Sequence, residues 1–262
     1  MAVNPELIRE ALAMWDDFPV DRDPRPVVLT MPSAQWEDAA AALLRRFRIF
    51  DAPAVPEREL PPGQLAAARR YCRDVQTGVP GRLGRIVRAA VPFATDRGDR
   101  RLPALVMLPD NRRWPFLVLD RDFERNRTWC PPGLPGPTEA PVSRLAGDDR
   151  TLTFRFFGQP EQVADFPNAV VTETATAVHV EPVRRYLRPD GYDAPMSVEE
   201  REVVVRLAAP MGGRALINEY GSPLTVVPHS ARIVTDEDRI RAMERWYETG
   251  SGNGADAPCP GG

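Results

Sequence analysis

The stretch TLTFRFF, residues 151–157, alternates polar and apolar side chains and decides how the second half of the chain folds. Leu152, Phe154 and Phe156 share one side of an extended backbone, because successive side chains of a strand point to opposite faces. One-sided alternation of this kind is typical of an antiparallel sheet with one dry face and one wet face. The same pattern returns in NAVVTETATAVHVE at 168–181 and in EVVVRLA at 202–208.

This alternation also predicts which side chains form the core of the sheet. Leu152, Val178 and Val203 are expected on its dry side, where they hold the molecule together. Read as a single strand, the second stretch places His179 and Glu181 on the opposite, solvated side. The sheet is thus predicted to be a passive framework with polar groups on its wet face.

The beginning of the chain shows helical spacing instead. Asn4 can cap a helix, Pro5 suits its first position, and apolar residues then recur every three or four positions as far as Trp15. Similar spacing predicts further helices over 33–48 and 62–74 and a closing helix over 235–248. A hairpin is predicted from the alternating stretches 102–108 and 114–120.

Together these elements predict an α+β fold, with N-terminal helices plus a hairpin, a C-terminal antiparallel sheet or small sandwich, and a closing C-terminal helix. Five prolines and three glycines make residues 131–149 the predicted connector. The predicted organisation is a helical and hairpin region at 1–130, the connector at 131–149, an antiparallel β region with its closing helix at 150–248, and a flexible tail at 249–262. A single domain over 1–248 is the alternative.

Composition excludes several classes of protein. The chain has 262 residues, 43% hydrophobic and 27% charged, which is typical of a soluble globular protein. No apolar run reaches the ~18 residues that suggest a membrane-spanning helix, so no membrane partner is expected. A formal net charge of −3 gives no overall attraction to nucleic acid. All 34 basic residues are arginines, which excludes catalysis by a Schiff-base lysine or a P-loop lysine.

The cysteines and the N-terminus predict a compartment. Cys72, Cys130 and Cys259 share no CxxC spacing and cannot all pair, so a disulfide framework is not expected. The first residues lack the basic and apolar regions of a signal peptide. We therefore expect a cytoplasmic protein, and no motif in the chain predicts a cofactor.

The segment 67–101 is the one stretch with a pronounced excess of one charge sign, since it holds nine arginines and three aspartates. Guanidinium groups make planar, forked contacts with carboxylates and phosphates, so an acidic protein or a phosphate-bearing ligand is the expected partner. The alternative is that these arginines pair with acidic residues of the second half of the chain. The residues expected to bind the partner are Arg69, Arg70, Arg73, Arg82, Arg85 and Arg88.

A second set of residues is suited to catalysis. His179 and Glu181 are two positions apart on a strand and share a face, and His229 would be a third ligand if a metal were bound. Cys130 follows Arg125 and Arg127, whose charges would favour a thiolate that one of the histidines could activate. The plainer interpretation is a solvated sheet face for His179 and Glu181 and a loop cap for His229. Cys72, the other candidate thiol, is expected to pack on a helix face. No motif completes either site, so we expect no metal.

The stretch VVVRLAAPMGGRALINEYGSPLTVV at 203–227, with 152–162 and 174–182 before it, resembles the C-terminal part of a family of uncharacterised actinobacterial proteins. In that family a strand, a Pro-Leu-Gly-Gly-Arg-Val-Leu segment and a Gly-x-Pro-Val ending recur. The resemblance implies a bacterial host and a fold, and brings no activity with it. In physical terms Gly212 and Gly213 permit a tight turn before Arg214, either as a purely structural turn or as a cradle for an anion.

The function that these features predict is a non-catalytic, cytoplasmic binding or interaction protein that uses the arginine-rich segment. A small-molecule enzyme, a hydrolase or isomerase with a pocket between the two halves, is the alternative. A self-associating homo-oligomer is a third hypothesis.

Overall fold

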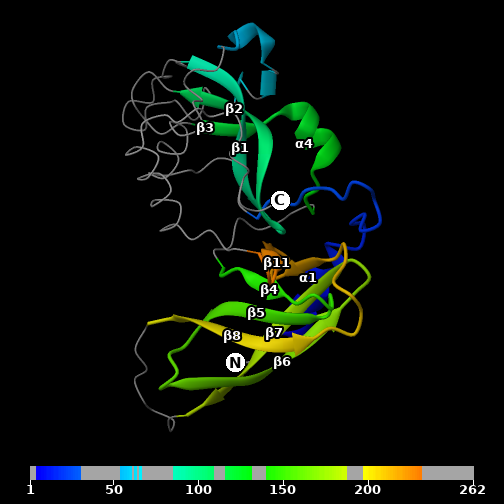
Figure 1. The fold of residues 1–262 in the computed structure, drawn as a ribbon, viewed down its shortest axis with the longest axis vertical. Coiled ribbons are helices and arrows are strands. Elements are labelled where there is room, and N and C mark those ends of the chain that lie inside the picture. Colours follow the sequence, from blue (N-terminus) through cyan, green and yellow to red (C-terminus); the bar gives the residue numbers. More distant parts are fainter. Residues whose placement is uncertain are drawn as a thin grey trace. The chain divides into compact units, whose positions relative to one another are not determined.

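The structure is a computed structural model that describes residues 4–30, 54–60, 62–63, 65–66, 85–108, 116–131, 140–187 and 197–231 (Figure 1). The described residues fall into two compact units. Unit 1 draws on Met1–Met31, Ala94–Asp99 and Arg127–Ala231, and unit 2 on Pro32–Phe93, Arg100–Asn126 and Arg232–Gly262. Each unit therefore combines segments that lie far apart in the sequence.

Unit 1 contains two four-stranded sheets, with strand orders β10-β9-β7-β6 and β11-β4-β5-β8. Most neighbours are antiparallel, but β7 pairs with β9 and β11 pairs with β4 in parallel. The strands are β4 (Ser143–Leu145), β5 (Thr151–Gly158), β6 (Ala164–Glu173), β7 (Ala177–Tyr186), β8 (Glu199–Arg206), β9 (Ala215–Ile217), β10 (Pro223–Leu224) and β11 (Val226–Pro228).

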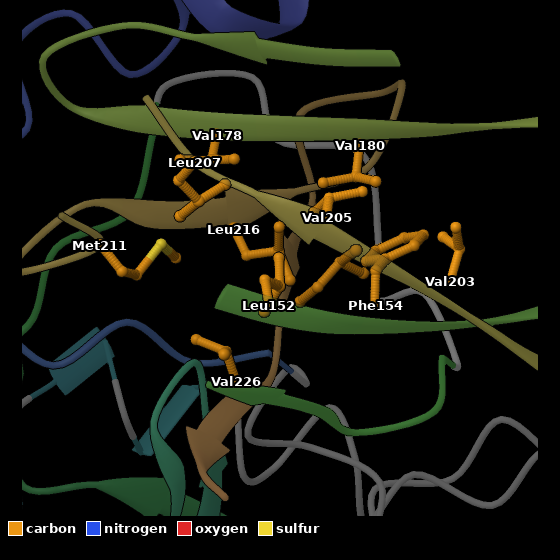
Figure 2. Packing of buried hydrophobic residues seen from close by; sticks show 11 residues of the cluster. Leu152, Phe154, Val178, Val180, Val203, Val205, Leu207, Met211, Leu216 and Val226 are labelled. Atoms are coloured by element: carbon orange, nitrogen blue, oxygen red, sulfur yellow. The ribbon is translucent and has the colours of Figure 1, made fainter. Parts of the chain in front are cut away.

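The two sheets pack face to face around one hydrophobic core (Figure 2). Leu152 of β5, Val178 of β7 and Val203 of β8 are all buried in it, as the alternation of the sequence predicts. Glu202, Val204 and Arg206 lie on the other face of β8, point away from this core and are exposed. The predicted dry side is therefore confirmed, and it faces the second sheet of a β-sandwich.

Helix α1 (Pro5–Ala13) covers the outer face of the sheet β10-β9-β7-β6. It begins as predicted, since the side chain of Asn4 accepts a hydrogen bond of 3.0 Å from the backbone N–H of Glu6. Ile8, Leu12 and Trp15 of this segment are buried in a second cluster with side chains of β7 and β9. This sheet therefore has two covered faces, and the prediction of one wet face is wrong for it.

The stretch 168–181 is not one strand, which corrects a second prediction. It forms the end of β6, a turn at residues 174–176 and the start of β7, and the two strands pair antiparallel. The hydroxyl of Thr174 accepts hydrogen bonds from the N–H groups of Thr176 (3.2 Å) and Ala177 (3.0 Å). A threonine hydroxyl thus closes a turn that has neither glycine nor proline to mark it.

Unit 2 contains most of a three-stranded sheet of order β1-β2-β3. The strands are β1 (Arg85–Thr95), β2 (Gly98–Leu108) and β3 (Phe116–Leu119), and the short helix α4 (Arg121–Arg127) follows. The antiparallel pairing of β2 with β3 confirms the predicted hairpin. Leu60, Ile86, Leu105 and Met107 form a buried cluster on this sheet, close to the one-turn helix η2 (Glu57–Glu59).

The predicted α+β fold class is wrong. The described part of the chain is mostly β, with three sheets and, besides the helical positions 62, 63, 65 and 66, two short α-helices of nine and seven residues. The helical signal at the N-terminus is genuine, but this helix packs on a sheet rather than on other helices. The predicted helices over 33–48 and 235–248 and the tail at 249–262 lie outside the described residues. Of 62–74, the described positions 62, 63, 65 and 66 are helical.

The predicted connector at 131–149, which would separate an N-terminal region from a C-terminal β region, stays a prediction. No helix in the described part of the chain is both long and apolar enough to cross a membrane.

Candidate functional site

His179 lies in the middle of the covered sheet rather than on a wet face. It shares a face with Ala177, and its register partner on β9 is Ile217; both of these residues pack against α1. Only 2% of His179 is exposed, and its Nδ1 atom is buried without a hydrogen-bond partner among the described residues. The prediction of a solvated histidine is therefore wrong, because sequence alternation does not reveal a helix that covers the sheet from outside.

Two carboxylates act electrostatically on this imidazole. Burial lowers the pKa of His179 below its ordinary value of 6.5, while the charges of Glu181 and Glu219 act in the opposite direction. Both glutamates are half-buried. The balance favours a neutral imidazole at neutral pH, which is the form that a base or a metal ligand requires.

His229 does not join this group. It is exposed just after β11, in the other sheet of the sandwich, and its backbone N–H donates a hydrogen bond of 2.6 Å to the carbonyl of Leu145. In the part of the chain that the structure describes, no three His, Cys, Asp or Glu residues are grouped so that they could hold a metal ion.

Cys130 is a free, exposed cysteine next to an aromatic cluster. The ring of its neighbour Trp129 lies 4.8 Å from those of Trp15 and Phe18, measured between centroids. Partial burial of the sulfur raises the pKa of the Cys130 thiol. The thiolate expected from the nearby arginines in the sequence is thus disfavoured.

The arginine-rich segment is only partly described. Arg69, Arg70, Arg73 and Arg82 lie outside the described residues. Arg85 and Arg88 of β1 and Arg100 and Arg101 of β2 are all exposed. The side chain of Arg88 is 58% exposed, and its Nε lies 3.5 Å from a carboxylate oxygen of Asp120. The two predicted residues that can be placed are therefore accessible, and one of them has an acidic neighbour within unit 2.

Arg97 of the same segment has a different role, which sequence analysis did not detect. Its Nη2 donates hydrogen bonds to the carbonyl oxygens of Gly212 (2.8 Å) and Arg214 (2.7 Å). Beside it, Arg25 forms a two-pronged ion pair with the buried Asp96, at 3.2 and 2.5 Å, and donates to the carbonyl of Gly213 at 2.7 Å. Two arginines from distant segments thus hold the carbonyls of the Gly-Gly turn.

Arg214, the third arginine at this turn, also forms its hydrogen bonds within the same unit. Arg214 is buried and donates to Glu173 at 2.6 Å, and to the carbonyls of Ala209 (2.7 Å) and Pro210 (3.0 Å). Burial by itself would raise the pKa of Glu173, but hydrogen bonds from the backbone of Ala208 and from Arg214 outweigh it and lower the pKa. The guanidinium beside the Gly-Gly turn therefore already binds a carboxylate of its own chain.

No protein-family model matches this chain, and no curated protein or solved structure is found to be similar to it. The resemblance of residues 203–227 to an actinobacterial family therefore stays a prediction.

Proposed function

We propose that this chain is a non-catalytic binding protein that engages an acidic protein segment or a phosphate-bearing ligand through the arginines of β1 and β2. The observation that carries the proposal is the exposure of Arg85, Arg88, Arg100 and Arg101 on two neighbouring strands of unit 2. The strand backbone holds these side chains in fixed positions, with Arg100 and Arg101 on opposite faces of β2.

Three arginines of unit 1, at the Gly-Gly turn, are less exposed than the four arginines of β1 and β2. Arg25, Arg97 and Arg214 each bond to a carboxylate or to backbone carbonyls of the same unit. The four arginines of β1 and β2 are exposed, and Arg88 also lies near Asp120 within unit 2. Forked contacts of arginine with such anions are stronger than neutral hydrogen bonds.

The test is a calorimetric titration of the full chain with polyglutamate and, separately, with inorganic phosphate. The variant Arg100→Glu/Arg101→Glu is expected to lower the affinity at least about tenfold, because it reverses two charges on β2. The matched control is Arg121→Glu/Arg125→Glu, which reverses two exposed charges on α4 of the same unit. Equal affinity for both double variants, or no binding of either anion by the wild type, would contradict the proposal.

One observation favours a second function, a small-molecule enzyme built around His179. This residue combines a lowered pKa, an Nδ1 atom without a hydrogen-bond partner among the described residues, and the electrostatic influence of Glu181 and Glu219. A panel of ester and amide substrates tests it. Hydrolysis that is lost in His179→Gln and kept in His229→Gln supports the enzyme, whereas no hydrolysis by the wild type, or equal rates in both variants, contradicts it.

A further inference from the structure

Among the described residues, the sandwich of unit 1 has four edge strands, and three of them are protected against pairing with another chain. β10 and β11 have two and three residues, and each contains a proline that offers no N–H group. β6 contains Pro167, and its register with β7 is shifted by an irregularity. β8 has none of these protections: its eight residues contain no proline and pair with β5 in one unbroken register.

The outward face of β8 is complementary to itself. Val204 is 63% exposed, and Glu202 and Arg206 lie two residues to either side of it, on the same face. If a second β8 pairs antiparallel with Val204 at the two-fold axis, each Val204 lies opposite the partner subunit's Val204. Each Glu202 then lies opposite Arg206 of the partner subunit. Apolar pairs and pairs of opposite charge stabilise neighbouring strands.

We propose that β8 is a self-association edge, through which two copies of this chain join their β11-β4-β5-β8 sheets into one continuous sheet. Within one copy the Nε of Arg155 already lies 3.4 Å from a carboxylate oxygen of Glu202. In the dimer this carboxylate lies between two guanidinium groups. Main-chain hydrogen bonds between the two strands supply the remaining stabilisation, as in other cases of strand addition.

Other registers that keep the core side chains of β8 on the core side are less favourable. A two-fold axis at Glu202 places two like charges opposite each other, which destabilises a strand pair. An axis at Val203 leaves Val204 opposite the Glu202 carboxylate. The axis at Val204 places opposite charges across from each other and covers the exposed valine; within one copy Arg206 also lies 3.3 Å from a carboxylate oxygen of Asp148.

The first test is the mass of the full chain in solution, by sedimentation equilibrium at concentrations up to about 200 µM. A single pair of strands is a small interface, so we expect a weak dimer with a Kd of about 10–100 µM. The mass should rise with concentration from 29.2 kDa toward twice that value. A mass that stays at 29.2 kDa throughout would overturn the proposal.

Substitutions on β8 then locate the interface. Val204→Arg and Glu202→Arg should each leave a monomer, and Glu202→Arg/Arg206→Glu should restore the dimer because it exchanges the two charges. The control is Val198→Arg, since Val198 is 65% exposed just before β8 and lies outside the paired stretch. Dimerisation of Val204→Arg as strong as that of the wild type would contradict the assignment.

A cysteine at the axis gives a positive readout. Val204→Cys should form a covalent dimer under mild oxidation, because the two side chains lie directly opposite each other. The wild type, with its own three cysteines, sets the background, and Val198→Cys is the matched control. Covalent dimers in Val198→Cys but not in Val204→Cys would place the interface elsewhere.

Discussion

At the scale of single residues, the Gly-Gly turn shows how strictly one position can be constrained. A Cβ atom added to Gly213 would lie 2.4 Å from the carbonyl oxygen of Val20, a distance that side chains do not adopt. Gly212 has a positive φ of 47°. The sequence marked both glycines as a turn, but it could not indicate that a backbone segment from the N-terminus passes directly over Gly213.

Gly213→Ala is therefore expected to lower the free energy of unfolding by about 1–3 kcal/mol, because the backbone must shift to admit the methyl group. Gly147→Ala is the control, since nothing lies within 4 Å of its added Cβ atom. Urea unfolding of both variants measures the difference. Equal stability of the two variants would show that Val20 does not pack on this turn.

His179 should make the stability of unit 1 depend on pH. Its pKa is lowered in the folded state, so below its ordinary pKa of 6.5 the unfolded chain binds the proton more readily. Stability is then complete above that pH and falls as the pH drops through and below 6.5. Glu181 and Glu219 are the charged groups that oppose this shift.

The measurement is urea unfolding at pH 7.5 and pH 5.5. His179→Gln should reduce the loss of stability between the two pH values, whereas His229→Gln should keep it. An unchanged pH dependence in His179→Gln would mean that this imidazole is not buried in its neutral form.

At the scale of secondary-structure elements, α1 is the covering layer of a β-sheet. The indole N–H of Trp15, just beyond the end of α1, donates a hydrogen bond of 2.9 Å to the carbonyl of Gly221, and the residue is fully buried. Trp15→Ala is expected to cost about 3–5 kcal/mol of unfolding free energy. Arg9→Ala, an exposed position of the same helix, should change it by less than about 0.5 kcal/mol. A small effect of Trp15→Ala on the free energy of unfolding would contradict the packing of α1 against the sheet.

The ion pair between Arg214 and Glu173 joins the end of β6 to the loop before β9. Arg214→Met leaves a partly buried carboxylate without its cation, and is expected to cost about 3–5 kcal/mol. Glu173→Gln should cost less, because it removes the charge while keeping a hydrogen-bonding side chain. Since the pKa of Glu173 is lowered by folding, the stability it contributes should vanish as the solution becomes acidic. Thermal unfolding at pH 7 and pH 3.5 measures both effects.

The elements also show how far sequence reasoning reaches. The strands near 151–157 and 202–206, the N-cap of α1 and the dry side of the sandwich follow from local spacing, and the structure confirms them. The Thr174 turn, the parallel pairing of β7 with β9 and the helix over His179 depend on contacts between distant segments. For the same reason, neither the burial of His179 nor the clustering of arginines around residues 212–214 could be predicted from the sequence.

At the scale of the whole molecule, the chain forms two units, and the proposed binding surface lies on one of them. In unit 1, Arg25, Arg97 and Arg214 bond within the unit, and β8 is an edge strand of its sheet among the described residues. The arginines of β1 and β2 in unit 2 are exposed, and the anion-binding function rests on them. Two proposals thus concern two separate surfaces, so each can fail without the other.

The salt dependence of anion binding tests the proposed function most directly. Attraction between exposed charges weakens as ions screen it, over about 10 Å at 0.1 M salt. The affinity of the full chain for polyglutamate should fall steadily as sodium chloride rises from about 50 to about 500 mM, with a much shallower fall for Arg100→Glu/Arg101→Glu. An affinity that does not change with salt, or the same slope in that variant, would contradict binding through the arginines of β1 and β2.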